Sequence, residues 1–194
     1  MHSFTTLIAL SALFIGCADP HPSLGPLGGT AFQLADGAQV RLKELFGDTA
    51  TVVITLDPEC PFSRTYARVI DSLARSYDPH GVRFIGLYPT EFISREAVQA
   101  FAQEARFAFP QILDPDCHLT LAIGARILPE AFVFDANGSG VYQGAIDDAA
   151  IRPGRRKLVA TRHHLGDVLN ATLAGAPFPP GADAVGCRVE CLRE

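Results

Sequence analysis

One short stretch constrains the fold of this chain more than any other: a buried strand that turns sharply into an amphipathic helix. Residues 51–56 are β-branched or apolar and are bounded by turn residues, so they predict a strand buried on both faces of a sheet. Cys60 and Pro61 follow within a few residues, and Pro61 suits the first turn of a helix. Apolar residues then recur at helical spacing as far as Tyr77. The stretch predicts strand, sharp turn and helix, with Cys60 at the turn.

The rest of the chain supplies partners for this unit. A second apolar strand at 82–88 must run parallel to the first, because a helix crosses over between them. The other predicted elements are an N-terminal hairpin (31–34 and 40–42), a helix capped by Ser94 and ending near 105, a short helix (119–123), an antiparallel hairpin (131–134 and 141–144) and a last helix opened by Thr161 and reaching 173. The pattern predicts an α/β fold, a central mixed sheet flanked by helices.

Length, composition and charge limit the classes of function. The 194 residues have room for one ordinary domain plus a tail, and 48% hydrophobic residues exclude a disordered chain. Sixteen basic residues face 21 acidic ones, for a net charge of −5, and no stretch gathers the dense Lys/Arg that neutralises phosphates. Nucleic acid is therefore not an expected partner.

The N-terminus has the features of an export signal. Residues 7–15 form an apolar run that is too short to span a bilayer. The run leads into Phe14-Ile15-Gly16-Cys17, which resembles the bacterial lipobox, with Phe14 where that motif usually has Leu. The resemblance implies a lipid on Cys17 and a membrane anchor, and simple cleavage after Ala18 is the alternative. In both cases the mature protein is exported, to the periplasm or cell envelope.

These features divide the chain into four parts. Residues 1–17 are the signal and lipobox, and the Pro/Gly-rich residues 18–30 are expected to form a flexible tether. Residues 31–175 form the folded domain. Residues 176–194 form a C-terminal arm rich in Pro and Gly, which we expect to be mobile and which carries two cysteines.

Four segments, in this order, resemble the thioredoxin-like superfamily, and within it the exported redoxin group related to alkyl hydroperoxide reductase and thiol-specific antioxidant (AhpC/TSA) proteins. The segments are Asp57-Pro58-Glu59-Cys60-Pro61-Phe62-Ser63, Leu128-Pro129-Glu130-Ala131-Phe132-Val133-Phe134-Asp135, Tyr142-Gln143-Gly144-Ala145-Ile146-Asp147-Asp148 and Gly186-Cys187. The resemblance implies a thioredoxin-like fold and thiol chemistry without a cofactor.

Cys60 is the expected nucleophile. At a helix N-terminus the unpaired N–H groups and the helix dipole favour the thiolate over the thiol. Asp57 and Glu59 oppose this effect if their carboxylates approach the sulfur. We therefore expect a modest depression of the Cys60 pKa.

The resemblance assigns roles to neighbouring residues and also marks departures. It implies that Pro129 follows a cis peptide bond and that the Leu128 backbone aligns an incoming substrate strand. Ser63 stands where thioredoxins have a second cysteine, so it can donate a hydrogen bond to the Cys60 sulfur but cannot resolve a disulfide. Arg64 is a candidate for stabilising a thiolate or a peroxide oxygen, or is a solvated surface residue. Asp57 stands where peroxiredoxins have a peroxide-binding Thr.

The remaining cysteines bear on the mechanism. Cys187 matches the terminal Gly-Cys of the group and is the preferred partner for resolving Cys60, whereas Cys117 is expected merely to begin a helix. Four cysteines allow three full pairings, and in one of them Cys187 and Cys191 bond to each other as a local pair.

Other polar residues give weaker signals. Cys117 beside His118 suggests a copper site like that of thioredoxin-like copper chaperones. Those proteins have a second motif cysteine four residues after the first, and here that position is Arg64. The adjacent His163 and His164 face different directions, so no metal is expected. Asp147 and Asp148 are either catalytic or cap a loop that extends to residue 160.

The sequence thus predicts an exported thiol oxidoreductase in which Cys60 reduces a disulfide or a peroxide and an external thiol supplies the electrons. A redox-inert thioredoxin-like binding module is the alternative.

Overall fold

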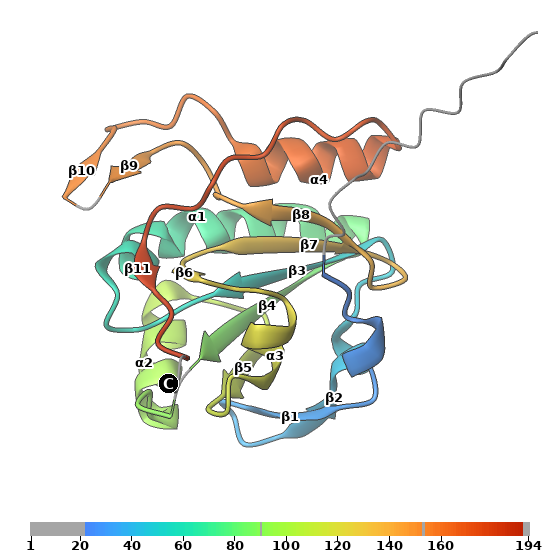
Figure 1. Ribbon diagram of the computed structural model, residues 1–194, viewed down its shortest axis with the longest axis vertical. Coiled ribbons are helices and arrows are strands. Elements are labelled where there is room, and N and C mark those ends of the chain that lie inside the picture. Colours follow the sequence, from blue (N-terminus) through green and yellow to red (C-terminus); the bar gives the residue numbers. More distant parts are fainter. Residues whose placement is uncertain (1–21, 90, 153, 192–194) are drawn as a thin grey trace, which may run out of the picture.

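A seven-stranded mixed sheet forms the centre of the protein (Figure 1). The structure, a computed structural model, describes residues 22–89, 91–152 and 154–191. The strand order is β2-β1-β5-β4-β3-β7-β8. The strands are β1 (Ala31–Leu34), β2 (Gln39–Arg41), β3 (Ala50–Thr55), β4 (Val82–Pro89), β5 (Gln111–Asp114), β7 (Ala131–Asp135) and β8 (Gly140–Gly144).

The pairing agrees with the sequence patterns. β3 runs parallel to β4 and β4 parallel to β5, whereas β7 pairs antiparallel with both β3 and β8, and β1 pairs antiparallel with β2 and β5. All six residues of β3 are buried, as expected for a strand in the middle of the sheet. The fold is α/β and thioredoxin-like, with a central mixed sheet flanked by helices.

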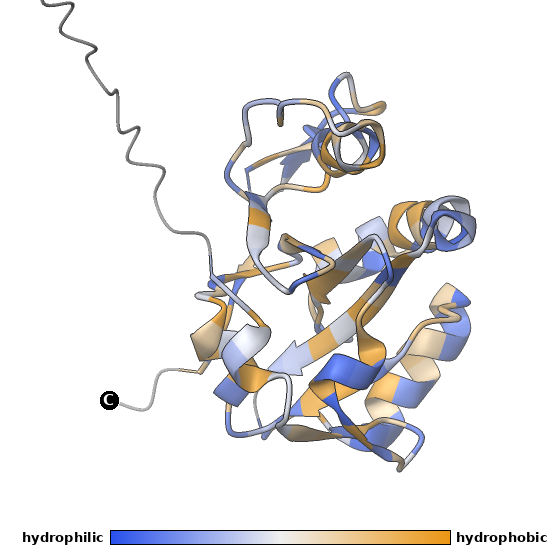
Figure 2. Ribbon diagram, turned by 90° about the vertical axis from the view of Figure 1, so that its right-hand side faces the viewer, coloured by the Kyte–Doolittle hydropathy of each residue, from blue (hydrophilic) through white to orange (hydrophobic). Residues whose placement is uncertain are grey.

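Helices cover both faces of the sheet. They are α1 (Pro61–Tyr77), α2 (Arg95–Ala105), α3 (His118–Ala122) and α4 (His164–Ala174), with 3-10 turns η1 (Gly25–Leu27), η2 (Leu42–Leu45) and η3 (Asp78–His80). The apolar sides of α1, α2 and α4 pack with Val52 and Ile54 of β3, while α3 and the N-terminal segment pack on the opposite face with Val53. This alternation along β3 is the two-residue period of a strand. Figure 2 shows the apolar sides of the helices turned toward the sheet.

The N-terminal segment differs from its prediction. Leu24 is completely buried, and its N–H donates to the Gly138 carbonyl at 2.8 Å. Ser23 forms a β-bridge with Ser139. Residues 22–30 therefore pack onto the domain and form no free tether, because apolar residues are spaced between the prolines and glycines. The predicted signal and lipobox, with Cys17, and tether residues 18–21 lie outside the described residues.

Two small strand pairs complete the chain. β9 (Ala150–Arg152) and β10 (Arg155–Arg156) form a hairpin, and β11 (Cys187–Arg188) pairs antiparallel with β6 (Ile127–Leu128). Between them, α4 begins at His164, three residues later than predicted, because the backbone N–H and hydroxyl of Thr161 bind the Asp148 carboxylate. Among the helices of the described residues, none combines the length and apolar character needed to cross a membrane.

Candidate active site

Cys60 occupies the N-cap position of α1, where the end of β3 turns into the helix. Its side chain is 3% exposed, and Pro61 takes the first helical position. The turn is closed by the Cys60 N–H, which donates to the Asp57 carbonyl, and by the Glu59 N–H, which donates to the Asp57 carboxylate at 2.7 Å. At an N-cap, the side chain faces the unpaired N–H groups of the first helical turn, which stabilise negative charge. In this disulfide form the Cys60 side chain makes no capping hydrogen bond to these N–H groups.

Cys60 forms a disulfide with Cys187 of the C-terminal arm. The two Cα atoms lie 6.3 Å apart, although 127 positions separate the residues in the chain. β11 places Cys187 opposite Leu128 of β6. The arm, which we expected to be mobile, is therefore tied to the domain by a covalent bond and a strand pair.

The peptide bond between Leu128 and Pro129 is cis, as the family resemblance implied. The Cys60 sulfur lies 3.4 Å from the Leu128 carbonyl oxygen, so the cis-proline loop and the start of α1 meet at the sulfur. The resemblance assigned the Leu128 backbone to an incoming substrate strand, and in this structure the strand paired there is β11.

Three buried or half-buried polar residues that the sequence did not single out hold this loop in place. The Thr55 hydroxyl donates to the Ile127 carbonyl at 2.6 Å and accepts from the Glu130 N–H at 2.9 Å. The Glu130 carboxylate accepts from the Ile127 N–H at 3.4 Å and from the Gln143 side-chain amide at 3.0 Å. The polarity of Thr55 and Glu130 was the available sequence signal. The partners of the Thr55 hydroxyl lie 72 and 75 residues away, whereas Ile127 and Gln143 lie 3 and 13 residues from Glu130.

Ser63 and Arg64 form hydrogen bonds with groups other than the Cys60 sulfur in this structure. Ser63 is buried, and its hydroxyl oxygen accepts from the Asp57 N–H at 3.2 Å, so it supports the turn and makes no hydrogen bond with the Cys60 sulfur. The Arg64 guanidinium donates to the Pro58 carbonyl at 2.7 Å and pairs with Glu104 of α2 at 3.1 Å. In this disulfide form Arg64 links α1 to α2 and is half exposed.

A second disulfide joins Cys117 to Cys191, with 5.7 Å between the Cα atoms. Cys117 is buried at the N-cap of α3, so it begins a helix as expected, but it is also bonded. Because Cys191 is bonded to Cys117 and Cys187 to Cys60, the alternative local pair of Cys187 with Cys191 is wrong. Within residues 22–89, 91–152 and 154–191, no group of three or more potential metal ligands occurs, and His118 packs its ring against Phe32.

Beside the first turns of α1 lies a pocket of about 290 Å³. Phe62 and Tyr66 of α1 line one side, and Arg155 and Arg156 of the β9–β10 hairpin line the other. The Tyr66 hydroxyl donates to the Asp147 carboxylate at 2.6 Å, and burial together with this bond raises the pKa of Tyr66. Cys60 is not among the lining residues, so the pocket adjoins the Cys60 turn without containing the sulfur.

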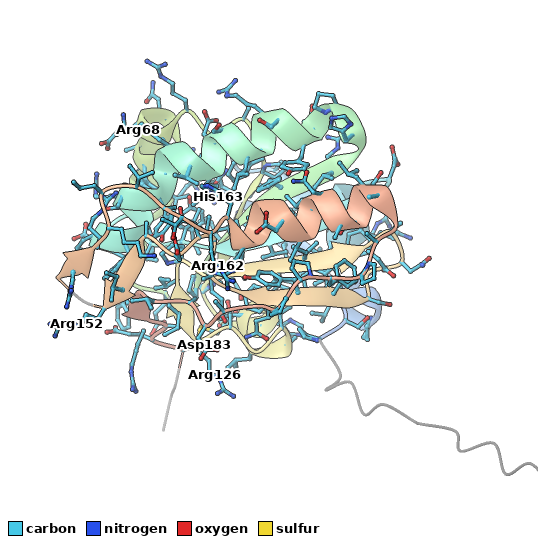
Figure 3. The ribbon with its side chains drawn as sticks, turned by 90° about the horizontal axis from the view of Figure 1, so that it is seen from above. Arg68, Arg126, Arg152, Arg162, His163 and Asp183 are labelled. Carbon is cyan, nitrogen blue, oxygen red and sulfur yellow. A yellow bond between two sulfur atoms is a disulfide. The ribbon has the colours of Figure 1, made fainter. Side chains whose placement is uncertain are left out.

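Asp148 closes the loop that carries this hairpin. Its carboxylate accepts from Lys157 at 2.5 Å, from the Thr161 N–H at 2.7 Å and from the Arg162 N–H at 3.1 Å. Lys157 and Thr161 hold the pKa of Asp148 well below its usual range. Figure 3 shows Arg152 on the projecting hairpin, and Arg162 beside His163 where the chain returns to α4. These contacts account for Asp148 as a loop-closing residue.

Comparison with known proteins identifies the family of this chain. Residues 29–142 match the sequence profile of the AhpC/TSA family. An uncharacterised conserved protein from Geobacillus kaustophilus is 30% identical, with a TM-score of 0.74 over 85% of this chain and 92% of its own. A hypothetical protein from Sinorhizobium meliloti is 23% identical, with a TM-score of 0.80 over 92% of this chain and 98% of its own.

A third structure with this fold has a described activity. The bacterioferritin comigratory protein of Xanthomonas campestris, whose structures concern alkyl peroxide reduction, is 21% identical, with a TM-score of 0.57 over 78% of this chain and 94% of its own. Among curated protein sequences, none matches this chain.

Proposed function

The chain belongs to the AhpC/TSA family, and from this premise we propose that it is a thiol oxidoreductase in which Cys60 reduces a peroxide or a disulfide and Cys187 resolves the intermediate. One observation carries the proposal. The Cys60–Cys187 disulfide lies at the N-terminus of α1, with the Cys60 sulfur against the loop that holds the cis-proline. A helix N-terminus activates a thiol, and a second thiol within bonding distance can complete a two-electron reaction.

With a hydroperoxide the steps balance as follows. The Cys60 thiolate attacks the terminal peroxide oxygen, so an S–O bond forms, the O–O bond breaks, and the alkoxide leaves and takes up a proton. Cys60 is then a sulfenic acid. The Cys187 thiolate attacks its sulfur, the disulfide forms, and the hydroxide that leaves becomes water. Two thiols are oxidised and one peroxide is reduced to an alcohol and water.

With a disulfide substrate the same two cysteines act by exchange. The Cys60 thiolate attacks one sulfur of the substrate, and the other sulfur leaves as a thiolate and takes up a proton. The Cys187 thiolate then attacks Cys60 in the mixed disulfide and releases the second substrate thiol. The products are two substrate thiols and the Cys60–Cys187 disulfide.

An external thiol must reduce the Cys60–Cys187 disulfide again. The exposure of the two sulfurs indicates which one it attacks. Cys60 is 3% exposed, whereas Cys187 is partly exposed, so a donor thiolate reaches Cys187 more readily. Attack at Cys187 makes Cys60 the leaving group, and a sulfur at a helix N-terminus leaves readily as a thiolate. A second donor thiol then frees Cys187.

A redox-inert binding module is the second candidate. The burial of Cys60 favours it, because an external oxidant or thiol reaches a buried sulfur with difficulty. We also propose that residues 1–17 direct export and that Cys17 carries a lipid. Two disulfides in one small domain agree with an oxidising compartment outside the cytoplasm.

Stopped-flow oxidation of the reduced protein, by hydrogen peroxide and separately by oxidised glutathione, tests the oxidoreductase. Wild-type protein should form the 60–187 linkage, and Cys187→Ser should accumulate a sulfenic acid or an intermolecular disulfide at Cys60, both visible by mass mapping. Cys60→Ser, which retains the other cysteines, measures the background. If the wild-type protein reacts no faster than Cys60→Ser with either oxidant, the binding module is the better description.

A further inference from the structure

The outer edge of β6 is already occupied by the chain itself. Both residues of β6, Ile127 and Leu128, pair with the two residues of β11. The ladder continues by one more bond, in which the Val189 N–H donates to the Arg126 carbonyl at 3.0 Å. A strand edge with free backbone groups is a surface on which an extended peptide can pair. Here a peptide could pair beside the cis-proline only by displacing β11.

The arm lies very close to this edge at Gly186. A Cβ atom built on Gly186 would overlap the carbonyl oxygen of Leu128. A residue without a side chain is therefore required for the arm to approach the backbone of β6 so closely. This fit indicates that the paired arm is a specific feature of the site.

Covalent bonds hold the arm at two points. Cys187 is bonded to Cys60, and Cys191, four residues further on, is bonded to Cys117. A two-residue ladder is weak when nothing else supports it. The Cys60–Cys187 bond must open in every catalytic cycle of the proposed function. The Cys117–Cys191 bond takes no part in that cycle and can hold the arm throughout.

The remaining bond keeps the arm local when the first one opens. Four residues span at most about 14 Å, so Cys187 stays within that distance of Cys191. A group tethered this closely has an effective concentration of about millimolar or more. β11 therefore returns to β6 in preference to a peptide present at micromolar concentration.

We propose that the Cys117–Cys191 disulfide makes the Cys60 site selective for small oxidants, of the hydroperoxide class, over protein disulfides. This inference rests on the proposed redox function of Cys60. A small hydroperoxide needs to reach only the sulfur, whereas a protein disulfide arrives on a peptide that needs the edge of β6. Cys117 and Cys191 are positioning residues, because their bond affects the reaction by holding the arm near β6.

Two full-length variants isolate the effect. Cys17→Ser/Cys187→Ser leaves Cys60 as the reactive thiol and keeps the Cys117–Cys191 bond. The second variant carries Cys117→Ala and Cys191→Ala in addition. Each is mixed with hydrogen peroxide, with dithiobis(nitrobenzoate), and with a short peptide whose single cysteine is disulfide-bonded to thionitrobenzoate. The two small reagents report the intrinsic reactivity of Cys60, and the peptide reports access to the edge.

Loss of the Cys117–Cys191 bond should raise the rate with the peptide by about tenfold or more and change the rates with the two small reagents by less than about threefold, because a tethered competitor has been removed. A peptide rate that rises no more than the other two would overturn the inference. If Cys60 is silent toward all three reagents in both variants, the proposed function itself fails, and the inference with it.

A second pair of variants keeps both Cys117 and Cys191. In the Cys17→Ser/Cys187→Ser background, Val189→Pro removes the N–H that donates to Arg126, and Val189→Ala is the matched control that keeps it. Val189→Pro should raise the peptide rate selectively and Val189→Ala should not. Equal peptide rates in these two variants would show that the pairing of the arm does not guard the site.

Discussion

The hydroxyl of Thr55 fixes the cis-proline loop to the last residue of β3. It donates to the Ile127 carbonyl and accepts from the Glu130 N–H, and the side chain is fully buried. Because Cys60 follows β3 by only five residues, the same strand end places both the nucleophile and the loop that faces it. A local pattern of strand, Cys-Pro and helix predicted Cys60. The partners of Thr55 lie 72 and 75 residues away, and no local pattern marks them.

Replacing Thr55 with Val keeps the shape of the side chain and removes the hydroxyl. The Ile127 carbonyl and the Glu130 N–H then lose a buried partner, so Thr55→Val should lower the free energy of unfolding by about 2 kcal/mol. It should also slow formation of the Cys60–Cys187 bond, because the loop that positions β11 loosens. Urea denaturation and mass-mapped reoxidation measure the two effects. Thr55→Ser, which keeps the hydroxyl, is the control, and equal behaviour of Thr55→Val and wild type would contradict this role.

At the scale of elements, the sequence predicts α1 correctly but does not predict the structure of the loop before α4. Pro61 at the first helical position and a regular apolar period predict a helix over 61–77, and α1 spans Pro61–Tyr77. The loop after Asp148 has no such period, and the β9–β10 hairpin within it was not predicted. Its shape depends on hydrogen bonds from Asp148 to residues 9 to 14 positions later. From sequence, a capping role for Asp148 was at least as well supported as a catalytic one.

Asp148 makes this loop sensitive to acid. Lys157 and Thr161 lower the pKa of Asp148 in the folded protein, so its stabilising effect is present above the unfolded pKa and is lost as the pH falls below about 4. Hydrogen exchange of residues 149–161 should therefore become faster in this acid range, after correction for the intrinsic rate. Asp148→Asn should exchange fast at every pH and be cut more readily by trypsin at its basic residues. Asp183→Asn, on the exposed arm (Figure 3), is the control. Wild-type protection in Asp148→Asn would contradict this assignment.

For the whole molecule, composition misjudged both ends of the domain in the same way. Pro and Gly predicted a flexible tether and a mobile arm, but Leu24 is buried and Cys187 and Cys191 are bonded. Single apolar residues and cysteines decide these segments, and their partners lie in distant parts of the chain. The N-terminal segment and the C-terminal arm are attached at opposite ends of the strands of the sheet. Ser23 joins Ser139 beyond the Ala50 end of β3, whereas Cys187 lies at the Thr55 end (Figure 1).

This arrangement makes a prediction for the proposed lipid anchor. Between Cys17 and Pro22, the first described residue, five peptide steps reach at most about 18 Å, so a lipid on Cys17 would hold the Ser23 end of the domain near the membrane. β3 has six residues and spans about 20 Å, so with the Ser23 end at the membrane Cys60 would lie on the far side of the domain. Detergent phase partitioning should therefore place the wild-type protein in the detergent phase and Cys17→Ser in the aqueous phase. The oxidation rate of Cys60 by hydrogen peroxide should be the same for vesicle-bound wild type and soluble Cys17→Ser, because the membrane does not cover the site. Identical partitioning of the two proteins would refute the anchor, and a rate that falls on vesicles would refute the outward orientation.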